Sequence, residues 1–257
     1  MARPLLRRAK PSPSRPSPSD ARAQARLEAI AANCTPPARV EHHSGAELDP
    51  PLLRAVVDLT RRNMQDYVGG AWDEIAKREE LAHAETRHIA VRAGRQLIGF
   101  AAWRLTYEEG VLVGYLYELQ LETIARGMGL GSGLLAAVEG AARVAGATGL
   151  MLTVHTRNQG ARRFYKSDTI GFEVSPMSPA ECAPAVTAQA CDYEILQKLW
   201  DDDARRSLVK KGALARRANY VAAIEDGRLT VRCVMKGGRR SGPVADELAD
   251  PMTGPRT

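Results

Sequence analysis

Apolar and polar residues alternate with two different periods between Asp49 and Leu199. Apolar residues recur at helical spacing after Pro50–Pro51, where proline favours a helix start, and again in the segment 130–145. Shorter, mainly apolar runs predict strands, and Gly94–Arg95 predicts a hairpin turn between the first two of them. This order predicts a mixed α/β sheet with a helix after its central strand. The predicted helices span about 50–67, 73–84, 130–145 and a short segment after Asn158, and the predicted strands span 89–92, 97–105, 111–121, 150–155, 172–174 and 193–199.

The third predicted strand runs directly into a glycine-rich turn, Arg126-Gly-Met-Gly-Leu-Gly-Ser-Gly133, which opens the long helix. Glycine lacks a Cβ atom, so the backbone can turn tightly there and approach a ligand. The helix N-terminus adds unpaired N–H groups and the positive end of its dipole. The turn therefore predicts a site for an anionic cofactor, with a turn that binds nothing as the alternative. Its spacing does not fit the dinucleotide pattern G-x-G-x-x-G, and it lacks the lysine of the nucleotide-binding loop.

Composition limits the classes of function. With 257 residues and 44% hydrophobic content, the chain can bury one full core with sizeable flanks. The formal net charge is +6, but the positive excess lies in residues 1–50 and 200–257, so it is weak support for nucleic-acid binding by the core. The four cysteines form no C-x-x-C pair, which indicates a reducing compartment and no structural zinc. No apolar run reaches membrane-spanning length and the charged first ten residues leave no secretory signal, so we expect a soluble, non-secreted protein.

Both ends of the chain differ from the periodic part, which we expect to form a catalytic domain over 46–199. Residues 1–45 are rich in Pro, Ser and Arg, and we predict a disordered basic tail. A plain solvated tail, a nuclear signal at Leu6–Lys10 and an organelle transit peptide all remain open for it. Residues 200–257 predict a basic extension with a helix to about Ala218, a hairpin around 225–228 and disordered ends. This extension is either solvated or a nucleosome- or RNA-binding appendage.

The element order and the spacing Arg126-x-x-Gly129-x-Gly131 resemble the acetyltransferases of the GNAT superfamily, which bind the pyrophosphate of acetyl-CoA on such a turn. The resemblance implies the GNAT fold, a mixed, mainly antiparallel sheet with flanking helices. Eight segments are similar to the N-terminal acetyltransferase D (NatD) subfamily, namely Asn63-Met, Trp72, Lys77-Arg-Glu-Glu80, Tyr117-Glu-Leu-Gln-Leu-Glu122, Gly129-Leu-Gly131, Met151-Leu-Thr-Val154, Asn158-x-Gly-Ala161 and Tyr193-Glu-Ile-Leu196.

The NatD resemblance implies an activity. The enzyme would transfer acetyl from acetyl-CoA, without a metal, to the N-terminal amine of histones that begin Ser-Gly-Arg-Gly. It would act as a monomer in the nucleus and cytoplasm, away from membranes, with weak nucleic-acid contact through its basic tails. A lysine or small-amine acetyltransferase of the same fold and a non-catalytic acyl-CoA-binding module are the alternatives. Three tyrosines, Tyr67, Tyr117 and Tyr193, suit a confined peptide terminus better than a long aliphatic side chain.

The same resemblance implies roles for individual residues. A strand that splays at a bulge would present its amides to the pantetheine arm, and the glycine turn would hold the pyrophosphate, with Arg126 adding charge. The predicted cofactor-binding residues are Leu119, Gln120, Leu121, Arg126, Gly127, Met128, Gly129, Leu130, Gly131, Ser132 and Asn158, the last of which also predicts a helix cap. The predicted substrate-binding residues are Tyr67, Trp72, Thr106, Glu108, Tyr117, Thr153 and Tyr193. Thr106 stands where the family has an aspartate, which removes one acidic group from the peptide site.

The predicted reaction is attack of an uncharged amine on the thioester, so the amine must first lose a proton. An α-amine titrates near pH 8 and a lysine near 10.4, so their uncharged fractions at pH 7 differ by roughly 300-fold and a weak base suffices for an N-terminus. We predict that Glu118 is this base, that Tyr117 places the amine, and that Tyr193 gives a proton to the leaving sulfur. His155 is predicted to be structural, since the sequence indicates no partner for it.

Overall fold

A computed structural model of the chain describes residues 18–34, 36–68, 72–183 and 191–219, and the short segments 223–225 and 228–230. Its strands form a seven-stranded sheet in the order β1-β2-β3-β4-β5-β7-β6, in which only the pairing of β4 with β5 is parallel. This is the mixed, mainly antiparallel sheet that the sequence predicts. In chain order the elements are α1 (Pro18–Ala32), β1 (Ala38–Ser44), η1 (Gly45–Glu47), α2 (Pro50–Met64), α3 (Glu74–Ala82), β2 (Arg87–Ala93), β3 (Gln96–Glu108), β4 (Val111–Leu121), η2 (Thr123–Ala125), α4 (Leu130–Val144), β5 (Gly149–His155), α5 (Gln159–Tyr165), β6 (Glu173–Val174), α6 (Pro179–Cys182), β7 (Tyr193–Leu199), α8 (Asp202–Asn219), β8 (Ala223–Glu225) and β9 (Arg228–Thr230).

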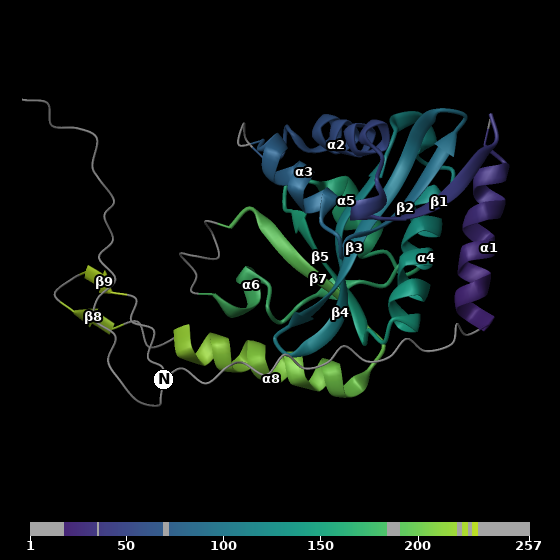
Figure 1. Ribbon diagram of the computed structural model, residues 1–257. Coiled ribbons are helices and arrows are strands. Elements are labelled where there is room, and N and C mark those ends of the chain that lie inside the picture. The colour runs from purple at the N-terminus through teal and green to yellow at the C-terminus, as the bar shows by residue number, and fades with distance from the viewer. Residues whose placement is uncertain are drawn as a thin grey trace, which may run out of the picture.

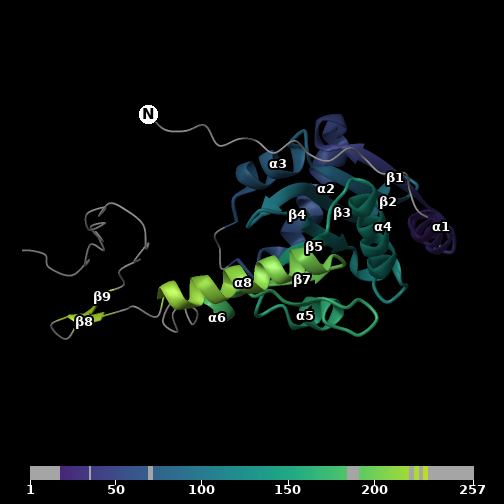
Figure 2. The same ribbon diagram turned by 90° about the horizontal axis from the view of Figure 1, so that it is seen from below.

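Helices cover both faces of the sheet (Figure 1). On the first face, α1 lies beside α4, and both enclose the main core around Trp103, Leu134 and Leu150. On the second face, α2 and α3 pack over Phe100 at one end, while α8 packs over Met151 at the other. Figure 2 shows α8 crossing below the strands, well separated from α2 and α3. The polar residues between these two covers are therefore the ones that a substrate can reach on the second face.

Helix α1 and strand β1 correct the prediction that residues 1–45 form a disordered tail. Helix α1 is held by tertiary packing, because Leu27 and Ala31 are fully buried and Leu27 lies close to Gly133 of α4. Strand β1 pairs with β2 along its whole length. The folded unit therefore includes residues from Pro18 onward and does not begin at residue 46. Residues 1–17 lie outside the described part of the chain.

Helix α8 shows that the predicted boundary at residue 199 is also misplaced. Ala204 and Leu208 are buried against β4, β5 and β7, and Gly212 lies so close to Pro176 that an added Cβ atom would come within 2.6 Å of its carbonyl oxygen. Several of the helix's basic side chains pair with carboxylates of the same fold, as in Arg216 with Glu181 at 3.1 Å. Helix α8 is therefore part of the folded domain, and β8 and β9 pair as the predicted hairpin.

A bulge in β4 sets the direction of its side chains. Ala102 pairs with Glu118 and Trp103 pairs with Leu116, so Tyr117 is one extra residue without a partner in β3. The extra residue reverses the alternation of faces. Leu116 and Leu119 both join the core beside α4, while Glu118 turns toward α3, where it contacts Lys77. None of the described helices has the length and apolar character needed to cross a membrane.

Candidate active site

Strands β4 and β5 separate where the bulge ends their pairing. Their parallel pairs are Gly114–Leu150, Tyr115–Met151 and Leu116–Leu152, and beyond these β4 pairs only with β3. Residues Thr153 to His155 of β5 pair on their other side with β7. The backbone of Leu119–Leu121 therefore has a strand partner on one side only. The Leu121 carbonyl accepts hydrogen bonds from Asn63 and Arg126, and the other main-chain groups on the β5 side have no strand partner. This matches the splayed strand that the sequence analysis predicts.

The glycine turn lies at the end of the same strand. Gly127 and Gly129 have φ angles of +76° and +83°, which favour glycine because a Cβ atom would strain the backbone. Gly129 caps α4 without a side-chain hydrogen bond, so the first N–H groups of the helix, at Leu130, Gly131 and Ser132, have no intrahelical acceptor. Among the described residues, no heavy atom outside its chain neighbours lies within 4 Å of the place where a Cβ of Gly127 would stand. The turn thus has the open, N–H-rich surface that a diphosphate needs.

These features agree with a comparison at the level of sequence. The pattern of the acetyltransferase (GNAT) family matches residues 53–172, which include β4, the glycine turn and α4. Residues 53–172, somewhat less than half of the chain, are therefore similar to the GNAT acetyltransferase family. Enzymes of this family use acetyl-CoA, the cosubstrate that the sequence predicts.

Solved structures of several acetyltransferases are similar to this chain. The PaiA N-acetyltransferase of Thermoplasma acidophilum, in complex with coenzyme A, has 17% identity and a TM-score of 0.45, covering 63% of this chain and 99% of that chain. An acetyltransferase of Streptococcus agalactiae has 18% identity and a TM-score of 0.49, with 62% and 98% covered. Naa50 of Arabidopsis thaliana, in complex with a bisubstrate analogue, has 21% identity and a TM-score of 0.44, with 63% and 99% covered.

Aromatic residues gather on the second face of the sheet, between α3 and α8. The rings of Tyr115 and Tyr117 lie 5.3 Å apart, and the Tyr115 hydroxyl is 2.5 Å from Oγ1 of Thr153. The guanidinium of Arg104 lies 4.7 Å from the centre of the Tyr117 ring. Tyr193 is about one-third exposed and pairs across the strands with His155. The structure therefore places the predicted residues Tyr117, Thr153 and Tyr193, from β4, β5 and β7, in one polar and aromatic cluster with Tyr115, which we call the aromatic cluster.

The remaining predicted substrate residues, Tyr67, Trp72, Thr106 and Glu108, lie on other elements. The ring of Tyr67 stacks on His155 at 6.3 Å, which places it at the end of β5. Thr106 and Glu108 occupy the last part of β3, and the neighbouring turn residue Glu109 contacts Lys211 of α8. Trp72 instead packs against the α2–α3 core, and its buried Nε1 atom has no hydrogen-bond partner in the described part of the chain. Trp72 is thus the predicted substrate residue that the structure ties most clearly to packing.

Burial raises the pKa values of three groups in this region, Glu108, Tyr115 and Tyr193. Burial raises the pKa of Glu108, and the neighbouring Glu109 carboxylate raises it further. Burial also raises the pKa of Tyr115, against the hydrogen bond from Thr153, which lowers it. For Tyr193, burial and then Cys191 raise the pKa of the hydroxyl. Both tyrosines therefore keep their protons at neutral pH and can act as hydrogen-bond donors.

The predicted base, Glu118, is not free. Its side chain is 7% exposed, its Oε1 atom accepts a hydrogen bond from Nζ of Lys77 at 2.7 Å, and its Oε2 atom accepts one from Nε2 of Gln120 at 2.7 Å. Asn63 in turn donates to Oε1 of Gln120 at 2.9 Å and accepts from Arg126 at 2.9 Å. A continuous chain of polar side chains therefore connects the glycine turn with Glu118.

Sequence analysis missed four residues of this arrangement: Asn63, Lys77, Arg104 and Tyr115. Asn63 and Lys77 stand in segments that resemble the NatD subfamily, but nothing in the sequence indicates that their side chains reach β4. Arg104 gives the one available signal, because it is a charged residue inside an otherwise apolar strand. Its guanidinium donates hydrogen bonds to Oγ1 of Thr86 at 2.7 Å and to the carbonyl oxygen of Glu80.

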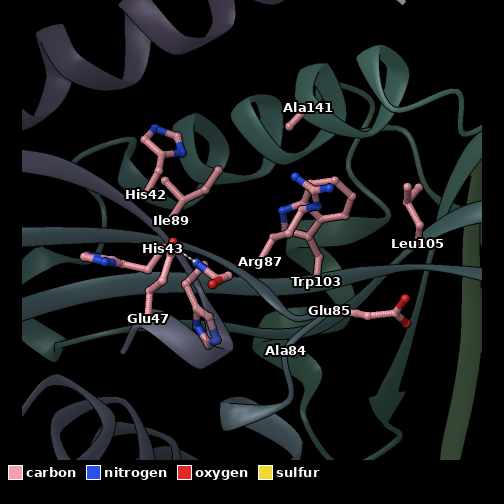
Figure 3. A pocket seen from close by; sticks show the side chains of 12 residues that line it. His42, His43, Glu47, Ala84, Glu85, Arg87, Ile89, Trp103, Leu105 and Ala141 are labelled. Carbon is pink, nitrogen blue, oxygen red and sulfur yellow. Dashed lines mark hydrogen bonds between the residues drawn. The ribbon is translucent and has the colours of Figure 1, made fainter. Parts of the chain in front are cut away.

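A separate cavity of about 530 Å³ lies near the edge of the sheet that β1 and β2 form (Figure 3). His42, Arg87 and Trp103 line it, and Ala141 of α4 stands above it. Burial lowers the pKa of the nearby His88 to about 4, so this imidazole is neutral at pH 7. None of the residues predicted to bind cofactor or substrate lines this cavity, so it is not part of the acetyl-transfer site.

Asn158 provides a test of its two predicted roles. Its Oδ1 atom accepts a hydrogen bond from the backbone N–H of Ala161 at 3.1 Å, which caps α5. We expect Asn158→Ala to lower the free energy of unfolding by about 1 kcal/mol, and Asn158→Asp to keep the cap. Denaturant unfolding measures this difference. If the side chain also contacts the cofactor through its amide nitrogen, Asn158→Asp will weaken acetyl-CoA binding in calorimetry without loss of stability, and unchanged affinity would restrict Asn158 to the cap.

Proposed function

We propose that this GNAT enzyme acetylates the N-terminal amine of a protein, and that its substrate is a histone tail that begins Ser-Gly-Arg-Gly. The observation that carries the proposal is the separation of β4 and β5 after Leu116, between the glycine turn and the aromatic cluster. A cofactor held on one side of this opening meets an acceptor held on the other. The histone sequence itself comes from the NatD resemblance.

Several groups of this chain fit acetyl-CoA. The N–H groups at the start of α4 and the exposed Arg126 would hold the pyrophosphate, and the main-chain groups of Leu119–Leu121 that have no partner in β5 would bind the pantetheine arm. Acetyl-CoA supplies an activated acetyl thioester when it is bound. Among the described residues no cluster of three or more His, Cys, Asp or Glu side chains is arranged to hold a metal ion.

The acceptor side suits a short, flexible amine. Tyr115, Tyr117 and Tyr193 would present their rings to a peptide terminus, and the hydroxyls of Tyr115 and Tyr193, whose pKa values are raised by burial, would donate hydrogen bonds to it. Glu108 supplies a carboxylate at the end of β3 for a basic residue further along the peptide. An α-amine is uncharged about 300 times more often than a lysine side chain at pH 7, so it needs little help to lose its proton. Tyr193 would donate a proton to the departing sulfur, since its raised pKa keeps the hydroxyl protonated.

We also propose that the enzyme works in the nucleus and cytoplasm, where newly made histones and their N-termini are present. Leu6–Lys10 lies outside the described residues, so this part of the proposal rests on the basic sequence alone.

The test is an acetyl-transfer assay with a Ser-Gly-Arg-Gly peptide and acetyl-CoA. We expect CoA release with a free N-terminus and at least tenfold less release when the N-terminus is blocked, because the blocked peptide offers no neutral α-amine. Thiol detection measures CoA release, and mass spectrometry places the acetyl group. Transfer to an internal lysine of the blocked peptide would indicate a lysine acetyltransferase. Tight acetyl-CoA binding without transfer to peptides or small amines would indicate a binding module and contradict the proposal.

A further inference from the structure

A chain of hydrogen bonds between side chains crosses the second face of the domain from the glycine turn to α3. It begins at Arg126, passes through Asn63 and Gln120 to Glu118, and ends at Lys77. Lys77 also donates to Oε1 of Glu80 at 2.6 Å. The chain therefore joins the end of α2, the splayed part of β4 and the middle of α3 at one place.

The charges in this chain are placed where water screens them little. The side chain of Glu118 is 7% exposed and that of Lys77 is 22% exposed. Burial pulls the pKa of Lys77 down, but Glu118 and Glu80 together raise it above its ordinary value, so the ammonium stays charged. Glu118 also adds to the burial that raises the pKa of Tyr165, and Arg104 donates a hydrogen bond to the carbonyl oxygen of Glu80. Lys77 contributes the only direct cationic contact that the described residues make with the Glu118 carboxylate.

We propose that Lys77 is a positioning residue for acetyl transfer. It holds the Glu118 carboxylate beside the bulge residue Tyr117, so that Glu118 orients Gln120 and Asn63 and keeps β4 splayed. This inference rests on the proposed function. In this proposal Glu118 is a fixed hydrogen-bond acceptor for Lys77 and Gln120, in place of the general base that the sequence predicts.

Removing the ammonium has a consequence that depends on pH. In Lys77→Met the buried Glu118 carboxylate loses the one cation that contacts it among the described residues. A buried carboxylate without a counter-charge destabilises the folded protein. We therefore expect the variant to be perturbed more at pH values where carboxylates are ionised than at low pH.

The experiment compares four variants with the wild type from pH 5.5 to pH 8.5. They are Lys77→Met, Lys77→Arg, the double variant Lys77→Met with Glu118→Gln, and Arg78→Met. Arg78 is the matched control, because it is a cation of the same helix whose bond goes to the half-exposed Glu74. We expect Lys77→Met to lower kcat at pH 8 by roughly tenfold or more, and its ratio to the wild-type value to recover as the pH falls. In the double variant, kcat relative to the wild type should depend less on pH and should be partly restored at pH 8. Lys77→Arg should keep most of the wild-type kcat.

Denaturant midpoints over the same pH range give a readout that needs no turnover. We expect the denaturant midpoint of Lys77→Met to fall further below the wild-type midpoint at pH 8 than at pH 5.5. In the double variant with Glu118→Gln, the difference from the wild type should no longer change with pH. A pH-independent loss in Lys77→Met, or the same loss in Arg78→Met, would overturn the positioning role. If the wild type itself acetylates no acceptor, the proposed function fails, whereas the midpoints still decide whether Lys77 holds Glu118 as an anion.

Discussion

Replacing Gly127 by alanine is expected to weaken acetyl-CoA binding by about tenfold or more, since the added Cβ atom stands on the open side of the turn that faces the ligand. Gly127 has a φ angle of +76°, and the described residues leave at least 4 Å of free space around the position of its Cβ atom. No protein atom is displaced by the new methyl group. The loss of affinity should therefore come from the ligand side, where the backbone must approach a diphosphate closely.

The chain offers a matched control for this experiment. Gly171 has a φ angle of +78° and equally free surroundings, but it lies after α5 and outside the glycine turn. Alanine at either position costs about 1–2 kcal/mol of stability through the same left-handed backbone. Denaturant unfolding should thus give equal losses, while calorimetry with acetyl-CoA should separate the two variants. Equal affinities in both variants would mean that residues 126–132 do not bind the pyrophosphate.

The sequence predicts the elements whose apolar period is strong. Strand β4 spans Val111–Leu121, as predicted, and α4 begins at Leu130, because Gly129 adopts a left-handed backbone conformation and caps the helix. Helix α1 and strand β1 escape prediction for a physical reason. Helix α1 is amphipathic only weakly and becomes stable by packing Leu27 on α4, and β1 is a polar edge strand that forms by pairing with β2.

The cofactor side of the site can be predicted further than the acceptor side. Four glycines in eight residues after a strand are a local signal, and the turn they predict is present. The polar chain from Arg126 to Lys77 depends on the bulge at Tyr117, which moves Glu118 and Gln120 to the face beneath α2 and α3. Simple alternation from Tyr115 would have placed Glu118 in the core beside α4. The single unpaired residue Tyr117 therefore decides which β4 side chains lie beneath α2 and α3. No local sequence pattern indicates this bulge.

The largest expected loss of stability comes from replacing Trp103 by alanine. The Trp103 side chain is 1% exposed and lies among the apolar residues between the sheet and α4. Trp103 pairs with Leu116, immediately before the bulge, and lies close to Gly114, where β4 and β5 are still paired. Removing the indole leaves a cavity beneath the last paired residues of these strands, so we expect a decrease of about 3–5 kcal/mol in the free energy of unfolding. Urea unfolding followed by circular dichroism measures it.

Tyr107→Ala is the control, because Tyr107 belongs to the same strand and is 39% exposed. We expect its effect to stay within about 0.5 kcal/mol, as for other surface substitutions. The cost of Trp103→Ala should also appear in the cofactor site, because the paired segment that ends at Leu116 fixes the point from which Leu119–Leu121 diverge. Acetyl-CoA at saturating concentration should raise the urea midpoint of Trp103→Ala less than it raises that of Tyr107→Ala. Equal shifts in both variants would show that the splayed edge of β4 keeps its shape without the indole beneath it.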